Sequence, residues 1–207
     1  MLNKIRDYMN FAGLQYRNPD KAGAEREKML ELRHKGQETR KAFTELAKAF
    51  QANHPEWQLQ QTSQWMNQAQ RLRPHFWIYL QREGQVTEPM MALRLYGIST
   101  DFGISLEVSF IERKKDEQTL GKQAKVLEIP TVEGVYYLVY SDSQSQRWKA
   151  NEENRQVLVE KIGSQEIRKV LVKADVSFIE NQSLEVILEK LDEAYKRLFP
   201  YYQATRG

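Results

Sequence analysis

The residues best suited to chemistry in this chain are aromatic and cationic. Aromatic rings can stack on nucleobases, and arginine adds both stacking and contacts to phosphate. These residue types occur at alternate positions in residues 77–79 and 94–96. They also form a basic run at residues 113–115. The candidate nucleic-acid-binding residues are Trp77, Tyr79, Arg94, Tyr96, Arg113, Lys114 and Lys115.

The aromatic residues of this set also have a purely structural explanation. Trp and Tyr side chains in strands often pack beneath a helix, with their polar tips hydrogen-bonded. The chain has enough helical segments to provide such a cover. The sequence therefore leaves open whether the aromatic face is exposed for binding or buried as part of the core.

Three consecutive strands are expected to position these residues, because apolar side chains recur at every second position from His75 to Glu112. One face of the resulting sheet would be apolar, and the opposite face would carry the aromatic and charged residues. The expected apolar face consists of Phe76, Ile78, Leu80, Met91, Leu93, Leu95, Ile104, Leu106, Val108 and Phe110.

The remaining segments predict an α+β fold. Residues 1–70 read as a polar, helical N-terminal third, in which Gly36 leaves one long helix and two shorter ones equally open. Further strands are expected at 134–140 and 170–176, a helix at 151–163, and a last helix that begins at 183 and ends at Pro200. Because strands are mostly neighbours in sequence, we expect an antiparallel or mixed sheet of about five strands with packed helices.

The domain organisation follows from the same pattern. Residues 1–70 form the helical region and residues 71–207 the α+β domain, unless the two make one continuous domain. A length of 207 residues allows either arrangement.

Composition excludes several classes of chemistry. The chain has no cysteine, so thiolate catalysis and cysteine-based zinc sites are ruled out. Its three histidines lie far apart in sequence, which favours structural or surface roles for His34, His54 and His75. No glycine-rich phosphate loop or serine-hydrolase motif is present. The sequence therefore predicts no catalytic residue, no cofactor and no metal site.

Charge and hydropathy bear on partners and location. A net charge of +3 permits nucleic-acid binding without demanding it. No apolar run approaches the roughly 20 residues of a membrane helix, and charges occupy the N-terminal segment where a signal peptide needs an apolar core. We therefore expect a cytoplasmic protein that does not enter a membrane.

One alternative is a metal-dependent nuclease. Asp101 followed by Glu112 and Lys114 resembles the signature of restriction-type nucleases, in which acids hold a divalent cation and lysine polarises water or phosphate. At about 3.3 Å per residue, an unbroken strand would separate Asp101 from Glu112 by roughly 30 Å or more. That separation argues against a shared metal ion.

Two short sequence segments resemble parts of a known protein family. The segment Leu95-Tyr96-Gly97-Ile98-Ser99 after a strand, and the late helix from Leu191 to Phe199, resemble parts of the N-terminal DNA-binding domain of McrB-type modification-dependent restriction proteins. The resemblance covers about residues 75–200 and leaves the helical third unmatched. It implies DNA binding in a bacterial defence or phage-related system, with the GTPase module of that family absent from this sequence.

The sequence thus predicts a nucleic-acid-binding module, with DNA as the partner that the resemblance implies. A second hypothesis is a protein–protein interaction or self-association through the N-terminal helices, since the apolar pattern of residues 20–50 is broken and can find its burial on a partner. The nuclease is the third.

Overall fold

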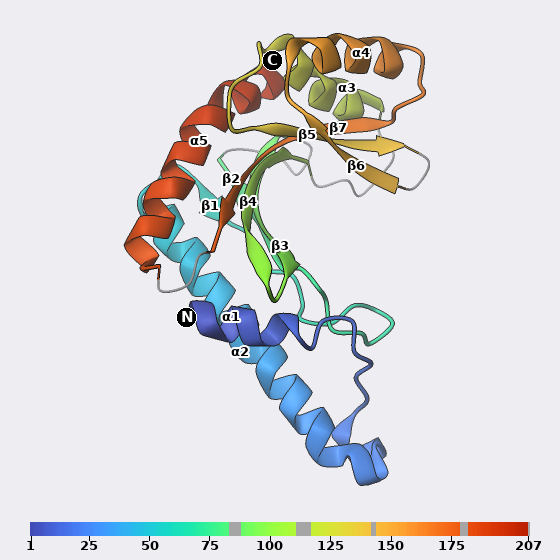
Figure 1. Ribbon diagram of the computed structural model, residues 1–207, viewed down its shortest axis with the longest axis vertical. Coiled ribbons are helices and arrows are strands. Elements are labelled where there is room, and N and C mark those ends of the chain that lie inside the picture. Colours follow the sequence, from blue (N-terminus) through green and yellow to red (C-terminus); the bar gives the residue numbers. More distant parts are fainter. Residues whose placement is uncertain (83–87, 111–116, 142–143, 179–181, 207) are drawn as a thin grey trace.

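The computed structural model describes residues 1–82, 88–110, 117–141, 144–178 and 182–206 (Figure 1). The strands are β1 (Gln58–Leu59), β2 (Trp77–Gln81), β3 (Met90–Ile98), β4 (Asp101–Ser109), β5 (Tyr136–Ser141), β6 (Gln144–Lys149) and β7 (Lys169–Ser177). The α-helices are α1 (Leu2–Met9), α2 (Arg26–Ala52), α3 (Glu117–Ala124), α4 (Glu152–Gly163) and α5 (Leu184–Arg206). Short 3-10 turns lie at Pro19–Lys21, Gly23–Glu25 and Lys125–Glu128.

All described strands belong to one antiparallel sheet in the order β1-β2-β3-β4-β7-β5-β6. The α+β class and the antiparallel sheet are therefore confirmed, whereas the expected number of about five strands was too low. The sequence pattern missed β1, which has two residues, and β6, whose sequence Gln-Ser-Gln-Arg-Trp-Lys lacks apolar alternation. Both are edge strands, and an edge strand with polar residues gives no hydrophobic period.

The predicted apolar face is buried. The side chains of Ile78, Leu93 and Leu106 are at most 1% exposed, and they pack in a core that also receives Val172 and Val139 from β7 and β5. Alternation along each strand points these residues to one side of the sheet. The same alternation sends the polar residues to the other side.

The described helices lie along one side of a strongly curved sheet. Figure 1 shows α5 and α2 beside the convex face and α3 and α4 above β5 and β7. The core is one cluster that contains Ile5 and Phe43 from the N-terminal helices and Tyr202 from α5. Within the described residues, no helix is long and apolar enough to cross a membrane.

The last helix does not end at Pro200, and this expectation was wrong. Helix α5 continues to Arg206 because Tyr201 and Thr205, both fully buried, pack beyond the proline. Pro200 and Lys196, whose carbonyl loses its usual amide partner, are both exposed, so water can replace the missing hydrogen bond. The Tyr201 hydroxyl donates to the Pro130 carbonyl oxygen at 3.0 Å and fixes this end of the helix.

Helix α2 runs without a break through Gly36, which resolves the choice between one helix and two. A Cβ atom at Gly36 would lie 2.6 Å from Trp65 Cε3 and 2.9 Å from Trp65 Cδ2. Trp65 is itself buried and packs edge-on against Tyr16 with ring centroids 4.9 Å apart. Glycine is needed here for close packing.

We predict that Gly36→Ala destabilises the protein by roughly 1–3 kcal/mol, because the indole of Trp65 must move. The matched control is Gly121→Ala in α3, where no atom lies within 4 Å of the new Cβ. That change should stabilise the protein by up to about 1 kcal/mol through helix propensity. Urea unfolding followed by circular dichroism measures both, and a stabilising Gly36→Ala would contradict the packing argument.

Candidate nucleic-acid interface

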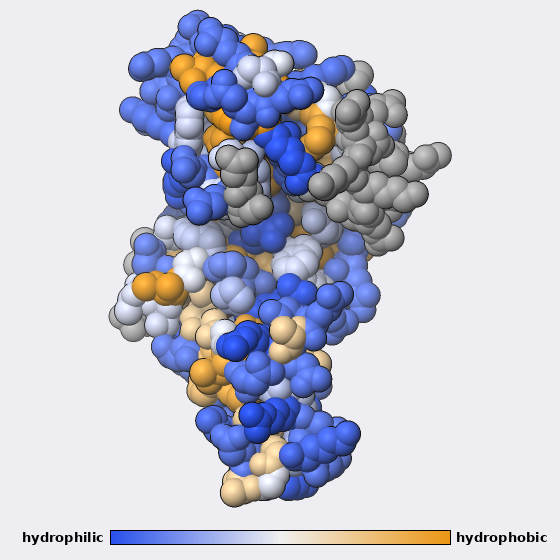
Figure 2. All heavy atoms as spheres, turned by 90° about the vertical axis from the view of Figure 1, so that its right-hand side faces the viewer, coloured by the Kyte–Doolittle hydropathy of each residue, from blue (hydrophilic) through white to orange (hydrophobic). Residues whose placement is uncertain are grey.

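The concave face of the sheet carries the candidate site. No described helix covers this face, and Figure 2 looks onto it, with hydrophilic residues across its middle. Register places Trp77, Arg94, Ser105 and Asp175 in one row across β2, β3, β4 and β7. The adjacent row reads Tyr79, Ala92, Glu107, Lys173, Tyr136 and Lys149.

Glu107 lies at the centre of this face and is fully buried. Its carboxylate accepts a hydrogen bond from Arg94 Nη2 at 2.9 Å and longer ones, at 3.3 Å, from Arg94 Nε. Lys173 Nζ lies 2.9 Å from the other oxygen of the same carboxylate. One buried carboxylate therefore holds two cations, and the three side chains together carry a surplus of one positive charge.

The charges of the two cations decide the ionisation of Glu107. Burial alone would raise the pKa of this carboxyl, but Lys173 and Arg94 outweigh burial and lower the pKa to about 2. Burial likewise disfavours the charged form of Arg94, and the neighbouring Glu107 more than offsets it, so the pKa of Arg94 is raised. Glu107 and Arg94 are thus both ionised at neutral pH.

Trp77 supports two guanidinium groups. The Cζ atom of Arg73 lies 4.8 Å from the centroid of the indole ring, and that of Arg94 lies 5.2 Å from it. Cations at these distances are attracted by the aromatic quadrupole. Trp77 is therefore better placed to position arginine side chains than to stack on a base.

A second cluster of side chains borders the centre. Asp175 accepts hydrogen bonds from Tyr136 Oη at 3.0 Å and from Arg147 Nη1 at 2.8 Å, and the Arg147 guanidinium lies 3.7 Å from the centroid of the Tyr136 ring. Burial, together with the Asp175 charge, raises the pKa of Tyr136. The tyrosine stays neutral, and its hydroxyl donates a hydrogen bond to the Asp175 carboxylate.

Tyr96 reaches across the neighbouring strand. Its hydroxyl forms a hydrogen bond of 3.1 Å with Ser177 Oγ, passing over Gly103 of β4. A Cβ atom at Gly103 would lie 2.8 Å from this hydroxyl and 2.2 Å from the Val176 carbonyl oxygen. The missing side chain makes room for the tyrosine.

The structure brings four of the predicted residues together and leaves three undescribed. Trp77, Tyr79, Arg94 and Tyr96 share the concave face, each only partly buried. Arg113, Lys114 and Lys115 lie outside the described residues.

Sequence reasoning assigned no site role to several residues of this face, namely Arg73, His75, Glu107, Arg147, Lys173 and Asp175. Alternation in the segments 104–110 and 170–176 already placed Glu107, Lys173 and Asp175 on the polar side of their strands. The pairing of β7 with β4, which brings Lys173 to Glu107, is not a local property of the sequence.

The three histidines have different surroundings. His54 Nε2 lies 2.8 Å from Asp192 Oδ1, and its ring packs on Phe50 and Tyr195, so it joins the end of α2 to α5. His34 is exposed on α2. His75 lies two residues before Trp77, on the concave face.

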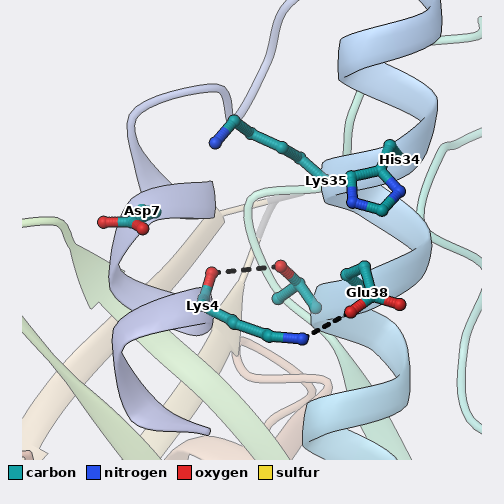
Figure 3. A pocket seen from close by; sticks show the side chains of 6 residues that line it. Lys4, Asp7, His34, Lys35 and Glu38 are labelled. Carbon is teal, nitrogen blue, oxygen red and sulfur yellow. Dashed lines mark hydrogen bonds and ion pairs between the residues drawn. The ribbon is translucent and has the colours of Figure 1, made fainter.

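A small crevice of about 120 Å³ lies between α1 and α2 around His34. Figure 3 shows Lys4 paired with Glu38, Thr39 donating to the Lys4 carbonyl oxygen, and Asp7 lying apart from His34. Cations and carboxylates balance among its lining residues. The crevice therefore has no net charge with which to favour an ionic ligand.

The nuclease pattern falls mostly outside the described residues. Asp101 opens β4 and is exposed, whereas Glu112 and Lys114 are not described. Among the residues that the structure describes, no three His, Asp or Glu side chains are grouped closely enough to hold a metal ion.

Comparison with known protein families and with curated proteins finds no match to this chain. The resemblance to the DNA-binding domain of McrB-type proteins therefore stays a prediction.

We predict that Glu107→Gln lowers the free energy of unfolding by about 3–5 kcal/mol at neutral pH, because the buried Lys173 and the partly buried Arg94 are left without a countercharge. The folded-state pKa of Glu107 lies below its ordinary value of 4.5, so its stabilising effect is complete above that pH. The effect is lost as the pH falls from 4.5 towards 2. The difference between wild type and variant should shrink over that range.

Urea denaturation across this pH range measures the effect. Asp101→Asn is the matched control, since Asp101 is exposed on the same strand and should change stability by no more than about 0.5 kcal/mol. Equal stability of Glu107→Gln and wild type at neutral pH would contradict the role of the buried carboxylate.

Proposed function

We propose that this protein binds nucleic acid through the concave face of its sheet. The observation that carries the proposal is the positive surplus at the centre of this face. Glu107 offsets only one of its two cationic partners, and Arg73 adds a further guanidinium over Trp77. Phosphate groups are the natural counterions for such a surface.

Phosphate contacts supply most of the affinity on this proposal. Arg73, Arg94 and Lys173 attract the backbone, while Tyr96 and Tyr79 are the aromatic residues nearest to a bound base. Stacking on tyrosine is tolerant of base identity, so the face itself predicts little sequence preference. The McrB-type resemblance further suggests that the protein recognises a modified base and acts in a defence system. The concave face itself provides no argument for either.

The distribution of charge supports this face over the rest of the surface. The whole chain carries a net charge of only +3. In the part of the chain that the structure describes, the concave face brings together six cations and two carboxylates, namely Arg73, Arg94, Arg147, Lys149, Lys169 and Lys173 with Glu107 and Asp175. A local excess of positive charge attracts polyanions even when the total charge is small.

The alternative of a partner for the N-terminal helices has less support. The apolar residues that prompted it are buried within the chain, and Met29, Leu32 and Phe43 are at most 3% exposed. Their burial needs no second protein. Binding at the concave face is therefore the function that the described residues support best.

Arg73→Gln should weaken nucleic-acid binding several-fold and lower the slope of log affinity against log salt by about one, because one phosphate contact is lost. Arg73 suits this test better than Arg94, whose removal would leave Glu107 with one cation. The matched control is Arg33→Gln, which makes the same charge change at an exposed position of α2.

The measurement is fluorescence anisotropy with labelled duplex DNA, single-stranded DNA and duplex RNA at low and moderate salt. Salt-sensitive binding that Arg73→Gln weakens and Arg33→Gln leaves intact supports the proposal. Absence of binding to all three probes at low salt, or equal loss in both variants, refutes binding at this face.

A further inference from the structure

We infer that Arg73, His75 and the outward edge of Arg94 form a binding subsite for one phosphate-type oxyanion beside Trp77. The inference rests on the proposed function, in which the anion is a backbone phosphate of the nucleic acid. The same chemistry would accept the phosphate of a small phosphorylated molecule. The experiment below separates these two sources.

The first part of the subsite is the free edge of Arg94. Glu107 occupies the side of the guanidinium that carries Nε and Nη2. The edge formed by Nη1 and Nη2 remains, and Nη1 has no hydrogen-bond partner among the described residues. With 28% of its side chain exposed, Arg94 can present this edge to an anion in the two-point geometry that suits phosphate.

Arg73 provides a second guanidinium without a countercharge. Its Nε atom is buried and has no hydrogen-bond partner among the described residues, and no carboxylate of the described residues pairs with it. Its guanidinium lies over the ring of Trp77, which also supports Arg94. A buried donor without an acceptor is costly, and an anion oxygen would satisfy it.

His75 adds a titratable ring that gains a proton, and with it a positive charge, more readily when an anion is bound. Its Nδ1 atom is buried and unpartnered among the described residues. Burial, followed by the charges of Arg94 and Lys173, lowers the pKa of His75, while the Pro74 carbonyl opposes the shift in smaller measure. An anion placed among these cations would favour the protonated ring.

The surroundings of His75 contain more cations than carboxylates. Among the described residues, the charged and titratable groups of this face are Arg73 and Tyr79 beside it, Arg94 and Tyr96 on β3, Glu107 on β4, Lys169, Lys173 and Asp175 on β7, Tyr136 and Tyr140 on β5, and Arg147 and Lys149 on β6. The two carboxylates are each already paired with cations. The free capacity of the site is therefore for an anion.

The test is nuclear magnetic resonance of the full chain with sulfate and with inorganic phosphate as probes. The side-chain signals of Arg73 and Arg94 and the ring signal of His75 should shift together, whereas the Arg33 signal should not. Sulfate keeps its double charge across the pH range used. Its binding should therefore be roughly three- to tenfold tighter at about pH 5.5 than at about pH 8, through protonation of His75 alone.

Two variants sharpen the result. His75→Gln should remove the pH dependence of sulfate binding, and Arg73→Gln should weaken binding at every pH. Arg33→Gln is the control that should do neither. Anion titration that leaves the signals of Arg73, His75 and Arg94 unmoved in the wild-type protein would overturn the subsite without any variant.

A short oligodeoxynucleotide then identifies the source of the anion. If it competes with sulfate at this site, the backbone phosphate is the ligand and both proposals stand. If sulfate and phosphate bind but the oligonucleotide does not, the subsite stands and nucleic-acid binding falls. If the oligonucleotide binds the protein without moving these three signals, the subsite falls while the proposed function stands.

Discussion

Burial of Glu107 between Arg94 and Lys173 constrains the rest of the sheet. A carboxylate removed from water is costly unless it is paired and hydrogen-bonded, and both partners must come from other strands. Arg94 lies on β3 and Lys173 on β7, so the pair fixes β4 between two strands far apart in sequence. Slippage by one residue would turn Glu107 into the apolar core, which makes this register strongly specified.

The same constraint explains why the helices lie on one side. The convex face carries the apolar residues of every central strand, and α2 and α5 bury them. The concave face satisfies the carboxylates of its centre within the sheet, Glu107 through Arg94 and Lys173, and Asp175 through Tyr136 and Arg147. A face whose polar groups are paired this way can remain without a covering helix. The centre of this face is buried, although no described helix covers it.

The central strands were predictable because apolar and polar residues alternate along them, and this local pattern shows which side chains are buried. Ile104, Leu106 and Val108 face the core at every second position, and no other periodicity fits them. Edge strand β6 has polar residues on both faces, so its pairing with β5 gives no hydrophobic signal. The end of α5 was predicted wrongly for the opposite reason. Pro200 is a strong local signal for the end of a helix, but the packing of Tyr201 overrides it.

The candidate site was predictable only in part, because its chemistry depends on pairs that the sequence keeps apart. Trp77 and Arg94 could be placed on one face from adjacent strands. The approach of Lys173 to Glu107 requires a strand pairing across more than sixty residues, which no local pattern encodes. Arg73 and His75 precede β2, which begins at Trp77, so no strand pattern in the sequence assigned them to a face of the sheet. The role proposed for them rests on the closeness of Trp77 and Arg94, which the sequence alone does not show.

An unbalanced cation in a partly buried site lowers stability in the free protein. A sheet selected for stability alone would pair Lys173 and Arg94 with one carboxylate each, or replace the cluster with apolar residues of similar volume. Retaining one carboxylate for two cations, with no carboxylate paired to Arg73 among the described residues, leaves the described part of the face short of negative charge. A bound anion would supply that charge and stabilise the folded protein in proportion to its occupancy. On the proposed function, the incomplete neutralisation of this face would thus couple anion binding to folding stability.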